Sequence, residues 1–358
     1  MAAEFRVAVF NAALYRDQAG GLIRDCQDAN DSKVAAVANV IREVNADVIL
    51  INEFDYDAEG FAAKAFAEIH LKSAYPHWFI GPVNTGVASG EDLNHDGDTT
   101  DPEDSFGFGK HPGQYGMLLL SRYPIDRKNV RTFQQFLWQN LPGNLLPKAH
   151  YGTAAAKLRL SSKSHWDVPI LLDGKTLHCL CSHPTPPAFD DGTIKDLSLE
   201  KPVDWNGRRN HDEIQFWARY IDAMEKPWMI DDQGKVGGLA AASPQGIESA
   251  FVILGDLNAD PVDGDSVNRA MDRLLQHPQV LDCPAPKSVG ALKRVKKSLQ
   301  NRDTKTSDFG LRCDYVLPSK SQLVWKASAV HWPEDDAIVR KASDHRAVWC
   351  DLSWTESK

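Results

Sequence analysis

The sequence predicts a layered α/β fold in which two β-sheets pack against each other and helices lie on the outside. The first observation is a strand, a helix and a second strand over residues 5–53, with polar residues at the strand ends. The second is the large number of apolar segments of strand length, against few segments with helical periodicity. A chain of 358 residues, 42% of them hydrophobic, is long enough to bury such a core.

The opening unit is read directly from its pattern. Residues 5–10 are typical of a first strand, and Asn11 ends it. Apolar residues at helical spacing follow, and Asp31 or Ser32 can cap that helix. A buried strand then stops at Glu53. The order of these elements is that of a layered α/β fold.

The later elements alternate between apolar strands and a few helices. No Pro- or Ser-rich linker, repeat or low-complexity tract divides the chain, so we expect one domain over residues 1–358. The Gly-rich stretch at about residues 81–116 is expected to be an inserted loop. Further strands are expected over residues 117–120, 157–160, 168–172, 176–181, 251–254, 313–317 and 346–352, and helices over about 210–224 and 266–275.

Composition narrows the classes of function. No segment approaches the roughly 18 apolar residues that span a bilayer. The net charge of −9 disfavours, without excluding, a protein that grips nucleic acid through its phosphates. The six cysteines are too few for a disulfide scaffold in a chain of this size. Cys179 and Cys181 share one face of a strand and favour buried free thiols over a zinc site.

Polar residues recur where apolar strands begin or end. Each has an ordinary alternative as a solvated turn or a helix cap, but five such coincidences in one chain are hard to attribute to turns. Oxygen ligands of this kind suit magnesium, manganese or calcium, and metal-assisted phosphoester hydrolysis needs them together with an acid and a base. The positions are Asn11, Glu53, Asp256 with Asn258, Asp314, and Asp344 with His345.

These motifs, together with His183 in Ser-His-Pro, resemble in order those of the endonuclease/exonuclease/phosphatase (deoxyribonuclease I-like) family over nearly the whole chain. The resemblance implies a four-layer α/β/β/α sandwich with two mixed, mostly antiparallel sheets. It implies that Glu53 holds the catalytic magnesium or manganese ion, or calcium, beside Asn11 and Asp344. It further implies that Asp256 and Asn258 position water and phosphate.

The resemblance also implies the acid–base and phosphate-binding groups. His345 would contact the phosphate or act as acid or base, oriented by Asp314. His183 would donate to a phosphoryl oxygen, and Tyr115 resembles the phosphate-contacting tyrosine of the family. The prolines after His183 depart from the usual pattern and are expected to reshape the pocket.

Three basic residues are further candidates for substrate binding. Lys163 and His165 both compete for the place of the basic residue that the family carries before the strand expected here over residues 168–172. Arg208 lies in an Arg-rich segment before a predicted helix, where a helix N-terminus and guanidinium groups can hold phosphate; a capped helix with solvated arginines is an equal alternative.

A second metal motif lies in the inserted loop. Residues 92–103 match the EF-hand calcium loop, with a glycine at the sixth position and a glutamate at the twelfth. An acidic surface turn is the alternative. The expected ligands are Asp92, Asn94, Asp96, Asp98, Thr100 and Glu103.

The expected location follows from the calcium loop and the first residues. The chain starts directly on a strand with no apolar leader. A calcium loop favours an extracytoplasmic protein, secreted or periplasmic, whose leader is absent from this chain; a cytoplasmic protein stays open.

The sequence therefore favours a metal-dependent phosphodiesterase or phosphatase acting on small or medium organic phosphates. A nuclease is the alternative, since nucleic acid is not excluded as a substrate. A catalytically inactive binding module of the same fold is the alternative from another class. No protein partner can be inferred.

Overall fold

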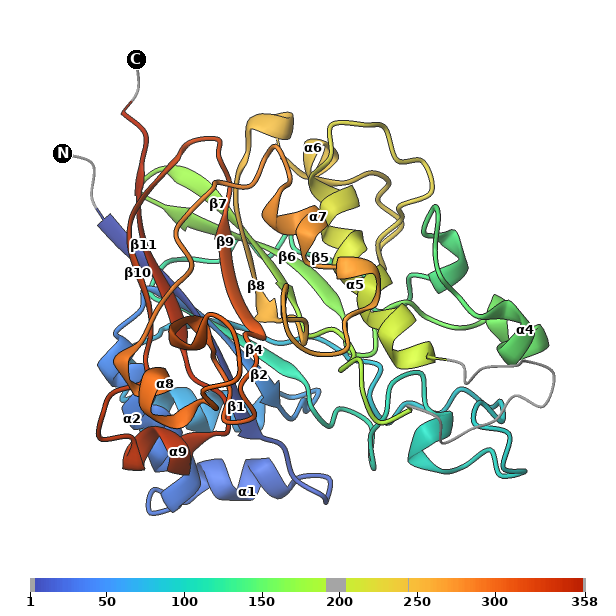
Figure 1. Cartoon of the computed structure of the whole chain (residues 1–358), viewed down its shortest axis with the longest axis horizontal. Coiled ribbons are helices and arrows are strands. Elements are labelled where there is room, and N and C mark those ends of the chain that lie inside the picture. The colour runs from blue at the N-terminus through green and yellow to red at the C-terminus, as the bar shows by residue number, and fades with distance from the viewer. Residues whose placement is uncertain (1–3, 191–203, 244, 357–358) are drawn as a thin grey trace.

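The computed structural model describes residues 4–190, 204–243 and 245–356. Its strands form two sheets that face each other, with helices on both outer sides (Figure 1). One sheet has six strands in the order β10-β11-β1-β2-β4-β3, and the other has five in the order β5-β6-β7-β8-β9. The predicted sandwich is therefore confirmed.

Both sheets are mixed. In the six-stranded sheet only β1 and β2 run parallel, and in the five-stranded sheet only β7 and β8 do, among the described pairs. The first sheet consists of β1 (Glu4–Leu14), β2 (Val48–Phe54), β3 (His77–Phe79), β4 (Met117–Ser121), β10 (Leu323–Val330) and β11 (Val348–Trp354). The second consists of β5 (Arg131–Thr132), β6 (His165–Leu172), β7 (Lys175–Ser182), β8 (Ala250–Asp256) and β9 (Asp314–Pro318).

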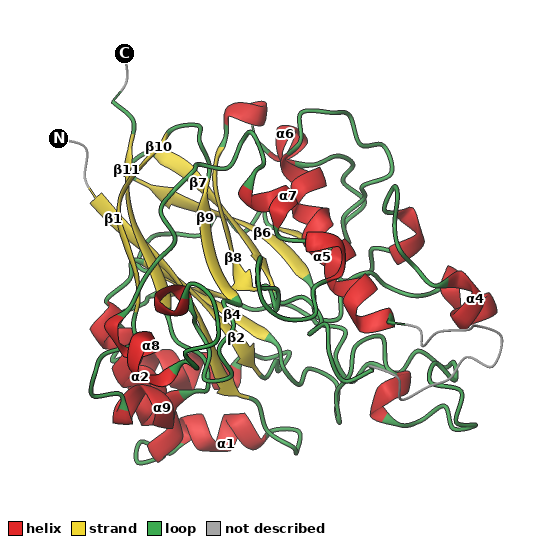
Figure 2. Cartoon of the chain, in the orientation of Figure 1, coloured by secondary structure: helices red, strands yellow, loops and turns green. Residues whose placement is uncertain are grey.

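The helices lie in two groups, one outside each sheet (Figure 2). The first group comprises α1 (Gly21–Gln27), α2 (Ser32–Val44), α3 (Phe61–Ala65), α8 (Val289–Arg294) and α9 (Ala337–Ala342). Beyond the other sheet lie α5 (Trp205–Ile221), α6 (Leu239–Ala242) and α7 (Asp272–Leu275), with α4 (Lys148–Tyr151) farther out. The predicted cap of α2 is Asp31, whose side chain accepts from the backbone N–H groups of Lys33 and Val34.

The side chains on the two faces of β7 pack in two different hydrophobic cores. Cys179 and Cys181 point between the two sheets, where they pack in one core with residues of both. Leu180, between them in sequence, packs in the other core with Ile214 and Trp217 of α5. The cysteines are buried free thiols, as predicted.

Several predicted elements were wrong in extent or type. Residues 157–160 form no strand, because Arg159 makes only an isolated bridge with Leu137. The helix predicted over about 210–224 begins five residues earlier, at Trp205. The one predicted over 266–275 is a 3₁₀ turn, Val267–Arg269, followed by the short α7. Strand β10 was missed, since its exposed residues hide the apolar pattern.

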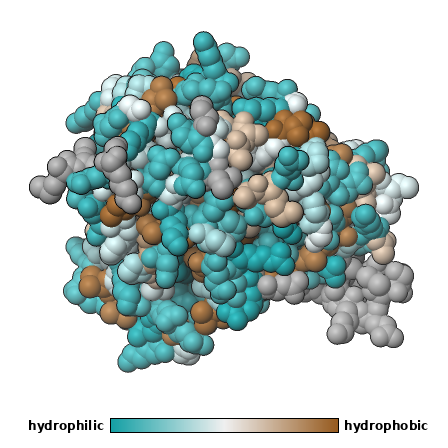
Figure 3. All heavy atoms as spheres, turned by 90° about the horizontal axis from the view of Figure 1, so that it is seen from above, coloured by the Kyte–Doolittle hydropathy of each residue, from teal (hydrophilic) through white to brown (hydrophobic). Residues whose placement is uncertain are grey.

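The face seen in Figure 3 is mostly hydrophilic, and its apolar side chains lie in small separate groups. Within the described part of the chain, no helix has the length and apolar character that a membrane crossing requires.

Candidate active site

The polar residues at the strand ends meet between the two sheets. The Nδ2 atom of Asn11 in β1 donates to Oδ2 of Asp256, the last residue of β8, over 2.8 Å. Beside it, Oδ1 of Asn52 in β2 accepts from the backbone N–H of Asp256, and Nδ2 of Asn52 donates to the carbonyl of Ser182 in β7. These bonds join the sheets at the end of the sandwich where both parallel pairs terminate.

His345 is held by two carboxylates. Its Nδ1 lies 2.9 Å from Oδ2 of Asp314, and its Nε2 lies 3.7 Å from Oδ2 of Asp256. Thr306 donates its hydroxyl to the same oxygen of Asp314. Burial would lower the pKa of His345, but the charges of Asp314 and Asp256 raise that pKa well above its usual value. The raised pKa favours the protonated imidazole, whose Nε2 faces Asp256.

His183 is the electrostatic opposite of His345. Its Nε2 lies 3.6 Å from Oδ2 of Asp256. Burial, reinforced by the positive charges of Lys163 and His345, holds the pKa of His183 well below its usual value. Its Nδ1 is buried without a hydrogen-bond partner among the described residues. Two imidazoles whose pKa values are shifted in opposite directions thus face the same carboxylate.

Asp256 is the carboxylate that both imidazoles face. Burial raises its pKa to about 7, although His345 acts in the opposite direction. Its Oδ1 accepts from the backbone N–H of Asn258, whose own Nδ2 donates to the carbonyl of Pro184. Asn258 thereby ties the Asp256 loop to the loop that carries His183.

Glu53 lies at the mouth of this network. Loss of water contacts raises its pKa, and the nearby charge of Asp344 raises it further, while His345 and a hydrogen bond from Asn11 lower it. Asp344 itself is exposed. Asn11, Glu53 and Asp344 stay the predicted cation ligands. Among the described residues, the carboxylate oxygens and ring nitrogen that lie within 4.8 Å of one another belong instead to Asp256, Asp314 and His345.

Three residues of the site have left-handed backbone conformations that side chains rarely adopt. The φ angles of Glu53, Tyr115 and Asn258 are 59°, 56° and 51°. The rings of Tyr115 and Tyr15 pack 4.6 Å apart, and burial together with Tyr15 and Glu53 raises the pKa of Tyr115 to about 12. Strained backbone of this kind concentrates at functional sites, where the surrounding structure holds it in place.

The three basic candidates separate clearly. Lys163 is buried, and the charges of Glu213, Glu53 and Asp256 oppose the lowering of its pKa by burial, so it faces the site. The ring of His165 hydrogen-bonds the hydroxyl of Ser161 and the carbonyl of Glu213, which leaves neither nitrogen for a substrate. The hydrogen bonds of the His165 ring therefore leave Lys163 as the available basic residue of the two.

Arg208 does not join the network. It lies exposed in the first turns of α5, where its guanidinium donates to the carbonyl of Leu145 over 3.5 Å. Its neighbour Arg209 instead turns inward and donates to the carbonyls of Leu160 and Phe106. Arg209 therefore stabilises the surrounding backbone.

Helix α5 supplies two bracing residues that the sequence reading missed. The buried carboxylate of Glu213 accepts from the backbone N–H groups of Ser162 and Thr185. Asn210 donates to the carbonyls of Thr185 and Leu257. The available signal was that Asn210 lies on the stripe of Ile214 and so places an amide on the buried face.

In the inserted loop, one ligand position differs from the predicted pattern. Asp92, Asp96 and Asp104 each offer one oxygen, and these oxygens lie within 4.8 Å of one another. Asp104 was not among the predicted ligands, whereas Glu103, which was, has an exposed side chain. Asn94 joins the group by donating to Asp96, and Asp98 and Thr100 bond each other at the exposed tip.

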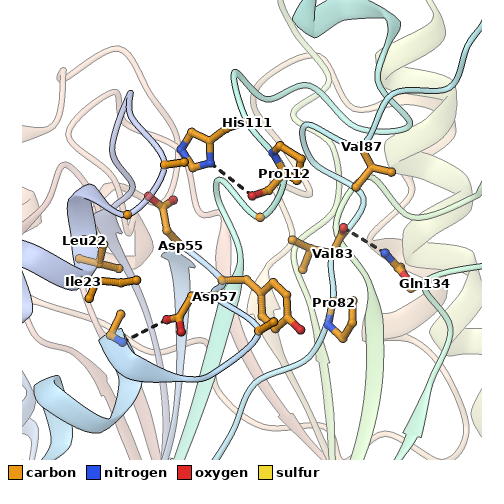
Figure 4. A pocket seen from close by; sticks show the side chains of 16 residues that line it. Leu22, Ile23, Asp55, Asp57, Pro82, Val83, Val87, His111, Pro112 and Gln134 are labelled. Carbon is orange, nitrogen blue, oxygen red and sulfur yellow. Dashed lines mark hydrogen bonds between the residues drawn. The ribbon is translucent and has the colours of Figure 1, made fainter.

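A cavity of about 390 Å³ lies beside the site. Figure 4 shows Asp55 and Asp57 with Leu22 and Ile23 on one side and Pro82, Val83 and Gln134 across from them. Asp55 also accepts from the backbone N–H of Tyr115 and so joins this cavity to the site. None of the described residues that line it is Lys or Arg.

Comparison with known proteins supplies the context for this geometry. The sequence model described as "Endonuclease/Exonuclease/phosphatase family" matches residues 20–345. Comparison with curated protein sequences gives no significant match.

Solved structures share the fold at low identity. An endonuclease/exonuclease/phosphatase from Beutenbergia cavernae is 19% identical, with a TM-score of 0.57 over 98% of this chain and 72% of that one. The human Nocturnin catalytic domain with bound sulfate is 13% identical, with a TM-score of 0.51 over 98% and 94%. A family protein from Bacteroides thetaiotaomicron is 11% identical, with a TM-score of 0.51 over 99% and 100%.

Proposed function

Because the chain belongs to the endonuclease/exonuclease/phosphatase family, we propose that it is a divalent-metal-dependent hydrolase of small or medium organic phosphoesters. The observation that carries this proposal is the buried network in which His345 and His183 both face Asp256, with pKa values shifted in opposite directions. Groups with opposed protonation states around one carboxylate are what proton transfer during phosphoester hydrolysis needs.

The residues present fit a magnesium or manganese ion. Glu53 and Asp344 are two neighbouring carboxylates, and burial together with the charge of Asp344 raises the pKa of Glu53. With the amide oxygen of Asn11 they form an oxygen donor set suited to a hard cation. A bound cation would neutralise charge on the phosphoryl oxygens and polarise the attacking water.

The side chains of the chain itself divide the remaining work. Asp256, with a pKa of about 7, accepts a proton from water near neutral pH. His345 donates a hydrogen bond or a proton to the phosphate through Nε2, since Asp314 occupies Nδ1. Lys163 faces the same carboxylates and offers a cation to the phosphate. Asn258 holds the loop of Asp256 against that of His183.

The cavity favours a small or medium organic phosphate over nucleic acid. Its described lining is largely apolar, with Asp55 and Asp57 as the carboxylates, His111 and Gln134 as further polar residues, and no Lys or Arg. Such a wall suits an uncharged organic group and repels a second phosphate. A nuclease is the second candidate, since the family includes such enzymes and Lys163 can contact one phosphate.

The deciding experiment compares hydrolysis of bis-p-nitrophenyl phosphate, p-nitrophenyl phosphate and supercoiled DNA, each with magnesium, manganese, calcium or a chelator. The proposal expects metal-dependent turnover of a small ester with little cleavage of DNA. Strong cleavage of DNA would favour the nuclease. Turnover that survives both the chelator and His345→Ala would contradict a metal-dependent site at this network, and no turnover of any substrate would favour an inactive binding module.

A further inference from the structure

The second acidic cluster lies in the inserted loop between β3 and β4, away from the residues of the active site. It consists of Asp92, Asp96 and Asp104, whose oxygens converge within 4.8 Å. We propose that this cluster is a calcium site. Its ligand on the buried side is Asp104, which lies one residue beyond the EF-hand pattern. The site is separate from the cation site at Glu53 and does not depend on the proposed activity.

The buried end of the cluster points to a ligand. Asp104 is only 1% exposed. One of its oxygens accepts from the backbone N–H of Leu93 over 2.5 Å, and the other, Oδ2, is buried without a hydrogen-bond partner among the described residues. A buried carboxylate oxygen without a partner is costly unless a cation compensates it. Asp92 and Asp96 are the acidic residues beside it.

A short turn explains why Asp104 replaces Glu103. The side chain of Asp101 accepts from the backbone N–H groups of both residues and starts the 3₁₀ turn Pro102–Asp104. This turn directs the side chain of Asp104 into the protein and leaves that of Glu103 exposed. The strict EF-hand pattern and the structure therefore assign the closing carboxylate to different residues.

Other residues of the loop are arranged around the acidic cluster. Gly97, at φ 92°, reverses the chain so that its N–H donates to Asp92. The amide N–H₂ of Asn94 donates to both Asp96 and Asp101, and rotation of this amide would present its oxygen instead. A cage of several carboxylates and one amide on a loop suits calcium, because magnesium requires a smaller octahedral site and keeps more water.

The loop is docked on parts of the molecule that a bound ion would help to hold. Nε2 of His95 lies 2.9 Å from the carbonyl oxygen of His150 in α4. Farther along, a side chain at Gly107 would clash with the carbonyl of Ser162. Asn84, at the start of the insertion, donates its backbone N–H to the carbonyl of Lys163. Calcium binding therefore stabilises the segment that packs against the backbone around Lys163.

The test measures binding of calcium and magnesium alone to the metal-stripped protein by calorimetry and by thermal melting. Wild type should bind calcium in preference to magnesium and melt at a higher temperature with it. Asp104→Asn should weaken calcium binding by roughly tenfold or more, because affinity follows the number of charged ligands. Glu103→Gln, the matched control one residue away, should bind calcium as wild type does.

Two further variants keep the result decisive. Asp96→Asn, at an exposed position, should also weaken calcium binding and serves if Asp104→Asn does not fold. Glu53→Gln should keep the calcium shift, which separates this site from the active site. The proposal is overturned if wild type shows no calcium shift, if Glu103→Gln loses it while Asp104→Asn keeps it, or if only Glu53→Gln abolishes it.

Discussion

Nδ1 of His345 lies 2.9 Å from Oδ2 of Asp314, so this carboxylate determines which ring nitrogen faces the site. The consequence is testable with Asp314→Asn. Loss of the negative charge should lower the pKa of His345, so that its charged form is lost at a lower pH. We expect kcat to fall by about 10²-fold or more and the loss of activity on the alkaline side to move to lower pH.

The control for Asp314→Asn is Asp351→Asn. Asp351 also pairs with a cation, Arg6, but lies partly exposed on the surface of the other sheet. Its variant should keep the wild-type pH profile. An Asp314→Asn enzyme with reduced kcat and an unshifted profile would indicate that Asp314 only supports the local structure.

The raised pKa of Glu53 leads to a prediction that separates metal binding from folding. Glu53→Gln removes the negative charge of Glu53, which Asp344 repels. The melting temperature in chelator should therefore stay the same or rise. The increase in melting temperature caused by magnesium or manganese in wild type should disappear, together with turnover. Melting curves with and without each ion provide the measurement.

Glu59→Gln is the matched control, since Glu59 is exposed in the turn after β2. It should keep both the metal-dependent shift and the activity. If Glu53→Gln still responds to magnesium as wild type does, the ion is held elsewhere and the assignment of Glu53 fails.

Much of the fold was predictable because an apolar run and the polar residue that ends it are neighbours in the sequence. Asn11 directly follows an apolar run, Glu53 and Asp256 follow one after a single intervening residue, and such runs predicted most of the strands around the site. By contrast, β10 is buried only at its two ends, and its apolar run Leu323–Trp325 is too short to mark a strand. Residues 157–160 looked like a strand but pack on neighbouring loops, a contact that depends on the tertiary structure.

Within the site, sequence reading identified the residues at the strand ends but could not find those that act across the chain. Glu213 reaches Ser162, 51 positions away, and Asn52 reaches Ser182, 130 positions away. The choice between Lys163 and His165 likewise required the structure, because the two are only two positions apart at the start of β6. Only the hydrogen bonds of the His165 ring show that it belongs to the interior.

The buried ring of His165 predicts a pH-dependent stability. Burial lowers its pKa from 6.5 to about 3, so the folded protein keeps it neutral while the unfolded chain protonates it below pH 6.5. The unfolded state therefore binds more protons between these values, and stability falls as the pH is lowered. From pH 7.5 to pH 5 this residue alone should cost about 2 kcal/mol.

His165→Gln tests this contribution, because glutamine cannot be protonated and can still bond Ser161 and the carbonyl of Glu213. The free energy of unfolding, measured in denaturant at both pH values, should fall less in the variant than in wild type. An equal loss in both proteins would mean that His165 is already charged in the folded state or that other groups cause the whole effect.

The cavity beside the site predicts how the organic part of a substrate is selected. Ala58 lines it from an exposed position, so Ala58→Trp should narrow the entrance without disturbing the core. For p-nitrophenyl naphthyl phosphate we expect KM to rise about tenfold, because apolar burial in the cavity is lost, and kcat to change little. For p-nitrophenyl methyl phosphate, with the same leaving group, both constants should stay near wild type. Ala58→Ser, which adds little volume, should leave kcat and KM for both substrates unchanged. If Ala58→Trp instead raises KM equally for the two esters, the organic group of the substrate lies outside this cavity.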